Sequence, residues 1–280
     1  MKKNVSMQIK LMLSQKSLHY TLIVLSLFSC VAFLVNCISN FGRPITDVPN
    51  AYFFFIGSSL SEGFYYIFSI ILPIICVIPF ADSYFRDRNK NTLPIIILRS
   101  SPVKYYFSKG IAIFISGFII VFISLALNFL LNFIAFPVSK GCDFTMFPTY
   151  YSDFYIKGYW SDNILLKNLF VGYPYLYNLL FLFIISIVGG IYSIIVNNLS
   201  YFTKKQHIMM LASMFVLSNV FAIISTVTNN FNIRLENYCF AFSQFESIEP
   251  TNIIIMTVLY LLMIFVPIPF CFKKLRDVIW

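Results

Sequence analysis

The charged side chains that could do chemistry gather in one segment of the chain, residues 82–109. Its first part carries Asp82, Arg86, Asp87 and Arg88. Arginines and carboxylates form charge-assisted hydrogen bonds with other proteins, and such bonds fix the orientation of a partner. This segment is therefore a candidate binding site for a partner protein.

A short apolar block, Leu93–Leu98, follows the charged part, and Pro94 interrupts it. These six residues are too few to cross a bilayer as a helix, which takes about 20. The block must lie in the membrane interface or insert into a groove on another protein. The sequence leaves open whether it docks or belongs to a solvated loop whose isoleucines contact lipid.

Signals of catalysis are nearly absent from the sequence. The two histidines, His19 and His207, lie at predicted membrane edges, and no G-x-S-x-G, H-E-x-x-H or G-x-x-x-x-G-K-[ST] pattern occurs. The six cysteines include no CxxC and no zinc-type spacing with histidine. We expect this chain to be no enzyme and to bind no metal or cofactor itself.

Uncharged polar and small residues remain within the apolar stretches. Asn128 and Asn132 are four residues apart, so they share one face of a helix. They either form interhelical hydrogen bonds or line the path of a substrate. Gly189 and Gly190 allow two helices to approach closely.

Long apolar stretches must position all these residues. Six of them carry no Lys, Arg, Asp or Glu: 17–42, 63–81, 110–139, 168–203, 206–233 and 250–272. Charged residues make up 11% of the chain, against roughly 25% in soluble domains. The sequence predicts an all-α polytopic membrane protein with six transmembrane helices, near 19–39, 63–80, 110–136, 174–197, 208–228 and 252–270.

The distribution of charge predicts the orientation. Fifteen of the 20 Lys and Arg residues fall in the termini and in the loops that would share a side with them. Such residues favour the cytoplasmic side, so both termini should be cytoplasmic. The net charge of +9 then reflects topology and contact with a lipid bilayer, and we expect no nucleic-acid partner. The heavy use of Ile, Phe, Tyr, Asn and Lys suggests an AT-rich bacterial genome, and therefore a multi-pass protein of the bacterial plasma membrane.

The chain shows no evident linker, and we predict one transmembrane domain over 1–280. Residues 1–18 are a basic segment with one apolar stripe, which we expect to lie along the inner interface as an amphipathic helix; the alternative is a flexible basic tail. The longest outer loop is 137–173, and the apolar piece 51–60 should lie at the outer interface or re-enter the membrane. Kinks or early helix ends are expected at the prolines within two helices, Pro73, Pro79, Pro267 and Pro269.

The order of residues in 82–109 resembles a known pattern. It is similar to the loop after the second helix in the membrane subunits of exporter-type ATP-binding-cassette transporters, the second class of such permeases. That loop has an acidic start, basic and acidic residues, Thr-Leu, an apolar run, Ser-Pro and a Lys at the next helix. The matching residues are Asp82, Arg86, Asp87, Thr92, Leu93, Ser101, Pro102 and Lys109. Asn91 stands where Gly is common in that family.

The resemblance implies that this chain is a permease subunit and that 82–109 forms a coupling helix seated on a separate ATPase subunit. Two copies of that ATPase would hold ATP and Mg, and a second copy of this permease or a related permease would complete the transporter. The cargo would be a peptide, a lipid or another amphipathic compound. The residues expected at the ATPase contact are Asp82, Arg86, Asp87, Arg88, Thr92, Leu93, Ile96, Ile97, Arg99, Pro102 and Lys109.

A second interpretation comes from another class of protein. The chain could be a non-transporting membrane immunity or sensor protein that binds a peptide through its outer loops. The aromatic loop 137–173 would then be the contact surface. A neighbouring gene for an ATPase with a phosphate-binding loop would favour the permease.

Overall fold

The computed structural model describes residues 2–45, 48–58, 62–138, 165–202, 207–228, 236–241 and 250–277. Regular structure in these residues is helical, apart from one isolated bridge between Ser58 and Ala241. The prediction of an all-α fold is therefore confirmed. In chain order the elements are α1 (Lys2–Leu13), α2 (Lys16–Ser39), η2 (Ala51–Phe54), α3 (Glu62–Ile75), α4 (Ser83–Asn89), α5 (Leu93–Arg99), α6 (Pro102–Ala135), α8 (Lys167–Gly172), α9 (Pro174–Ser200), α10 (His207–Val227), α11 (Glu236–Cys239), α12 (Pro250–Phe265) and α13 (Ile268–Asp277).

Four helices among the described residues are long and apolar enough to cross a membrane. They are α2, α6, α9 and the run Thr257–Arg276, which joins most of α12 to α13. The other two predicted crossings correspond to shorter apolar helices, Gly63–Ile75 in α3 and Ala212–Val227 in α10. Six crossings therefore remain a prediction, as does the cytoplasmic placement of the termini. Of the predicted outer loop 137–173, residues 139–164 lie outside the described residues.

Prolines lie where two helices of the chain, α3 and α12, end. α3 contains Pro73 and ends at Ile75, because proline lacks an N–H and its ring crowds the preceding turn. Similarly, α12 ends at Phe265 and α13 begins at Ile268, on either side of Pro267. The helix end expected near Pro73 and the break expected at Pro267 are both present.

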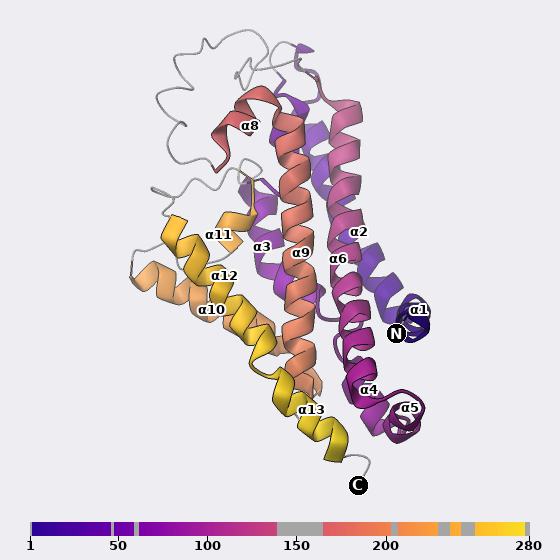
Figure 1. Cartoon of the computed structure of the whole chain (residues 1–280). Coiled ribbons are helices and arrows are strands. Elements are labelled where there is room, and N and C mark those ends of the chain that lie inside the picture. The colour runs from indigo at the N-terminus through magenta and orange to yellow at the C-terminus, as the bar shows by residue number, and fades with distance from the viewer. Residues whose placement is uncertain are drawn as a thin grey trace.

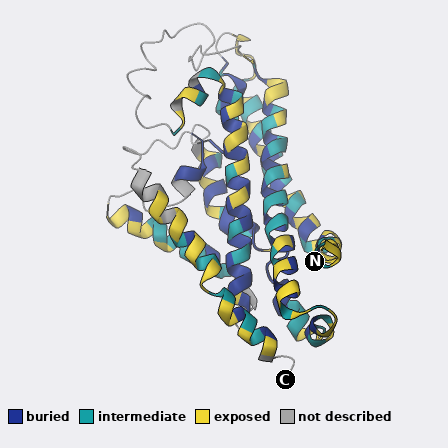
Figure 2. Ribbon diagram, in the orientation of Figure 1, coloured by how far each residue is buried: buried dark blue, intermediate teal, exposed yellow. Residues whose placement is uncertain are grey.

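Helices α6 and α9 lie side by side and form the axis of the bundle (Figure 1). Of the most apolar 18-residue window in α9, 61% is buried, against 17% for Thr257–Arg276 at the periphery (Figure 2). The two helices approach closely because glycines stand at their contact: a Cβ added to Gly117 of α6 would lie 2.6 Å from the backbone oxygen of Gly189 in α9. Gly189 thus has the role in helix contact that the sequence predicted.

Helix α6 begins earlier than predicted, at Pro102 instead of 110. The Ser101 side chain caps it by accepting a hydrogen bond from the Lys104 N–H at 3.4 Å. Pro102 follows at the first helical position, where a missing N–H costs nothing. The 34 residues of α6 span about 51 Å, more than the ~30 Å hydrocarbon core. Its first turns can therefore project from the membrane, at the end of the bundle where α4, α5 and α13 lie (Figure 1).

The N-terminal helix α1 packs against α6, and its Met12 is fully buried in the main apolar core. On its outer side Met7 and Leu11 are each 44% exposed, and Lys3 and Lys10 are exposed with them. This combination of basic and apolar side chains suits a membrane interface. The interfacial position of 1–18 remains a prediction.

Residues 48–58 turn back into the half of the bundle away from α5 (Figure 1). Phe55 and Ile56 of this segment are 0% and 1% exposed. The sequence allowed either re-entry or an interfacial position for 51–60, and the described part is inserted between the helices. Irregular backbone at membrane depth is tolerated only where protein surrounds it.

Candidate partner-docking site

The turn between α4 and α5 fixes the angle between these two short helices. Asn91, with φ of 53°, adopts the left-handed conformation just after α4. Its N–H donates to the Arg88 oxygen at 3.1 Å, and the Thr92 N–H donates to the Asp87 oxygen at 3.1 Å. This is the pattern of a Schellman motif, in which glycine is preferred and asparagine is the next choice. It gives a physical reason why Asn91 can stand where the resembled family commonly has Gly.

Helix α5 has two different faces. Leu93 and Ile97 are 1% and 2% exposed and pack among aromatic residues of α4 and α6. On the other side, Ile95 is 55% and Leu98 is 74% exposed, and Arg99 is exposed next to them. A helix of seven residues is not stable alone in water. The buried face therefore holds α5 in place and leaves Ile95 and Leu98 as an apolar patch.

A hydrogen-bonded ion pair joins α4 to α6. Asp87 Oδ2 pairs with Lys109 Nζ. Tyr105 bridges the pair, since its hydroxyl donates to Asp87 Oδ2 at 2.8 Å and accepts from Lys109 Nζ at 2.9 Å. Lys109 is only 1% exposed, and a buried charge is tolerated only when it is paired. The network thus ties α4, and with it α5, to the first turns of α6.

Charged contacts also tie α4 to the N-terminal helices. Arg86 Nη2 lies 3.0 Å from Asp82 Oδ1, and Arg86 Nη1 donates to Gln15 Oε1 at 2.8 Å. Gln15 stands between α1 and α2, so Arg86 links this helix pair to α4. The Arg88 guanidinium lies over the Tyr84 ring, 5.9 Å from its centroid.

Aromatic contacts continue from α4 to the last helices. Tyr84 stacks on Tyr201, with ring centroids 3.7 Å apart. Burial raises the pKa of both phenols, so they stay neutral. The Tyr106 hydroxyl donates to Asn198 Oδ1 at 2.7 Å, and Asn198 Nδ2 donates to the Ile264 oxygen at 3.0 Å. The start of α6 is therefore linked through α9 to α12.

The residues expected at the ATPase contact differ in burial. The buried ones are Asp82, Leu93, Ile97 and Lys109. The half-buried ones are Arg86, Asp87, Arg88, Thr92, Ile96 and Pro102. Arg99 is exposed. The contacts above give most of them a role in holding α4, α5 and α6 together, and their contact with a partner remains a prediction.

Four residues of this region are absent from those expected at the ATPase contact. Ile95 and Leu98 belong to the predicted apolar block Leu93–Leu98, and their spacing of three residues on one helical face would have separated them from the buried face. Tyr105 precedes Lys109 by four residues, which also places the two side chains together. Gln15 comes from a distant part of the chain, and no local signal marks it.

Asn128 and Asn132 hold the inserted segment 48–58. Asn128 Oδ1 accepts from the Ile56 N–H at 3.1 Å, and Asn132 Nδ2 donates to the Phe54 oxygen at 3.1 Å. Both asparagines are buried, at 0% and 1% exposure. They form structural hydrogen bonds, and contact with a substrate remains a prediction. Along α6, Asn128 lies about 28 Å from Lys109, so the two sets of predicted residues form separate regions.

Comparisons of the chain with protein families, curated proteins and solved structures find no match. The class of protein is therefore defined by the fold: a helical chain whose described residues include four helices able to cross a membrane.

Proposed function

We propose that this chain is the transmembrane permease subunit of an ATP-driven exporter of the ATP-binding-cassette type. One observation carries the proposal: α5 is anchored by its buried face and leaves Ile95 and Leu98 exposed on the other. Arg99 adds an exposed positive charge beside this patch. An apolar anchor with a neighbouring arginine suits insertion into a groove of a partner protein.

The anchoring also gives α5 a mechanical role. The Asp87, Tyr105 and Lys109 network joins the docking region to the start of α6. A partner that moves α5 moves α6 with it, because separating them would leave the Lys109 charge buried without its counter-ion. Since α6 packs along α9, the displacement reaches the axis of the bundle. ATP binding by the partner must favour one helix packing over another by a difference in free energy.

The proposed assembly has two ATPase subunits, which hold ATP and Mg, and two permease subunits, either identical or related. The chain crosses the bacterial plasma membrane six times, with both termini and residues 82–109 in the cytoplasm. It catalyses no reaction itself and has no nucleic-acid partner. The cargo is a peptide, a lipid or another amphipathic compound.

Co-purification tests the proposal. The tagged chain is expressed in its native host, and ATPases with a phosphate-binding loop are identified by mass spectrometry in the purified complex. We expect one such ATPase in the unmodified complex and its loss in the double variant Ile95→Asn with Leu98→Asn. The matched control is Met7→Asn with Leu11→Asn, which changes exposed apolar residues of α1 at the same end of the bundle.

Three results would contradict the proposal. The first is a purified chain that carries no ATPase and binds a peptide at its outer loops, as the immunity or sensor interpretation requires. The second is equal ATPase recovery from the α5 variant and the unmodified chain. The third is labelling of a cysteine placed at Leu98 by an impermeant reagent added outside the cell, because 82–109 would then lie on the outer side.

A further inference from the structure

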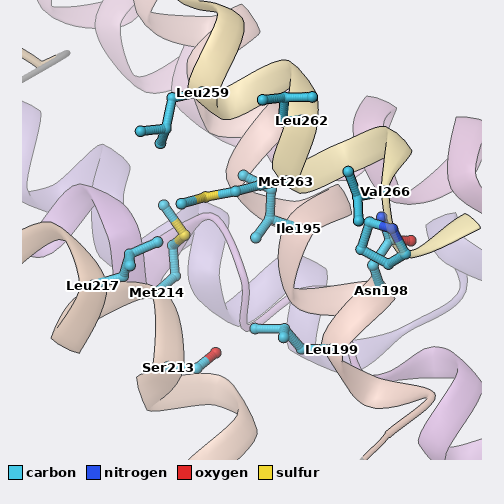
Figure 3. A pocket seen from close by; sticks show the side chains of 11 residues that line it. Ile195, Asn198, Leu199, Ser213, Met214, Leu217, Leu259, Leu262, Met263 and Val266 are labelled. Carbon is cyan, nitrogen blue, oxygen red and sulfur yellow. The ribbon is translucent and has the colours of Figure 1, made fainter. Parts of the chain in front are cut away.

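An apolar groove separates α12 from α9 and α10. Its volume is about 460 Å³, within the range of clefts that hold small ligands. Figure 3 shows Met214 of α10 and Met263 of α12 pointing toward one another across it. The lining residues are Ile195, Asn198, Leu199, Ser213, Met214, Leu217, Leu259, Leu262, Met263, Val266 and Pro267. Methionine side chains adapt to flexible apolar ligands.

The polar groups at the groove already have partners within the protein. Asn198 accepts from Tyr106 and donates to the Ile264 oxygen. The Ile264 oxygen, which accepts the bond from Asn198, lies next to the break at Pro267, where regular helical hydrogen bonding is interrupted. The groove therefore offers a ligand mainly apolar contacts, which a hydrocarbon chain can fill.

Basic residues follow the groove along α13. Val266 and Pro267 line the groove directly before α13 begins, and Phe270 and Lys273 are three residues apart on one face of that helix. Lys273 and Arg276 are exposed. Lys273 comes six positions after Pro267, or about 9 Å along a helix. A positive charge thus lies roughly one headgroup length beyond the end of the groove.

We propose that this groove holds one acyl chain of an anionic phospholipid, with the phosphate of its headgroup beside Lys273 and Arg276. The apolar lining favours the acyl chain of the lipid, and the basic residues of α13 favour a negatively charged headgroup. The inference requires α9, α10 and α12 to lie in a membrane. It does not depend on transport or on an ATPase.

Photolabelling of the purified full chain in lipid nanodiscs tests this site. The probes are phosphatidylglycerol and phosphatidylcholine, each with a photoreactive group in one acyl chain. We expect phosphatidylglycerol to label peptides from α10 and α12 and to saturate near one lipid per chain. Met263→Trp and Leu217→Trp should each reduce this labelling at least fivefold by filling the groove. Leu261→Trp is the control, because Leu261 is 47% exposed on the same helix and does not line the groove.

The charge is tested separately from the groove. Lys273→Gln should reduce phosphatidylglycerol labelling roughly fivefold, the effect of one basic residue near a lipid surface, and leave phosphatidylcholine labelling unchanged. Lys16→Gln, at an exposed lysine that begins α2, is the control. Equal labelling of the Trp variants and Leu261→Trp would overturn the site, as would labelling that rises without saturation in the unmodified chain. Equal labelling by both lipids would overturn the headgroup assignment.

Discussion

The two ends of the bundle hold the segments between their long helices by different chemistry. At one end, charged side chains tie α4 to α6 through the Asp87–Lys109 pair, and tie α4 to the junction of α1 and α2 through the contact of Arg86 with Gln15. Toward the other end, the inserted segment 48–58 is held by neutral amides of α6, as in the bond between Asn128 and the Ile56 N–H. At the charged end the contacts join side chain to side chain, whereas at the other end amides of α6 bond backbone groups of the inserted segment.

The difference follows from the cost of burying charge. An ammonium or a carboxylate loses far more hydration free energy on burial than an amide does. Charged side chains therefore lie near helix ends, where they can keep part of their contact with water. The Asp87 side chain, for example, is 25% exposed. Within a bilayer, an amide satisfies an irregular backbone at lower cost.

The largest expected effect comes from breaking the charged end. Asp87→Asn leaves the Lys109 ammonium buried without its counter-ion, so we expect the free energy of unfolding to fall by about 3–5 kcal/mol. Denaturant unfolding of the purified chain in micelles measures this. Adding Lys109→Met to that variant should recover part of the loss, because no charge is then left unpaired. Lys104→Met, at an exposed lysine of the same helix, should change little. A double variant less stable than Asp87→Asn would contradict the ion-pair account.

The contact between α6 and α9 connects the two ends, and glycine sets its spacing. Gly117→Ala places a Cβ 2.6 Å from the Gly189 backbone oxygen, so the helices must separate, at a cost of about 1–3 kcal/mol. Gly110→Ala is the matched control in the same helix, because its Cβ would meet nothing within 4 Å. That control should leave stability equal or raise it by about 0.5–1 kcal/mol. Thermal unfolding followed by helical circular dichroism measures both, and equal effects would refute the packing argument.

A substitution at the amide end should lower the free energy of unfolding less than one at the charged end. Asn128→Ala removes the acceptor of the Ile56 N–H, and we expect a loss of roughly 1–2 kcal/mol. Asn219→Ala is the control, because Asn219 Nδ2 bonds the Phe215 oxygen of its own helix at 2.8 Å. Hydrogen exchange at Ile56 should rise in the first variant only. If Asn128→Ala cost as much as Asp87→Asn, the comparison between charges and amides would fail.

The smallest effect on stability is expected at the exposed face of α5. Ile95→Asn with Leu98→Asn should change the free energy of unfolding by less than about 0.5 kcal/mol per residue, as is usual for surface sites. Leu93→Ala, on the buried face of the same helix, should cost about 2–5 kcal/mol. Both are measured by denaturant unfolding in the absence of a partner. Similar losses for the two faces would show that α5 is not held as described.

The break at Pro267 could be predicted from sequence because its signal is local. Ser101 and Pro102 carry an equally local cap signal for the start of α6, although the apolar pattern placed that start at 110. The partners of Arg86 could not be predicted fully, since Gln15 is 71 residues away in the chain. Nor could the role of Asn128, because its bond to Ile56 spans 72 residues.

Composition and residue pattern were enough to predict that the chain is helical and apolar, roughly where its long helices lie, and which segment carries the charge. These properties depend on composition and on periodicity over a few residues. The folded arrangement was needed to show which face of α5 is buried, that Asp87 pairs with Lys109, and that 48–58 enters the bundle. Such contacts join residues far apart in the chain, and packing around the α6–α9 axis selects them.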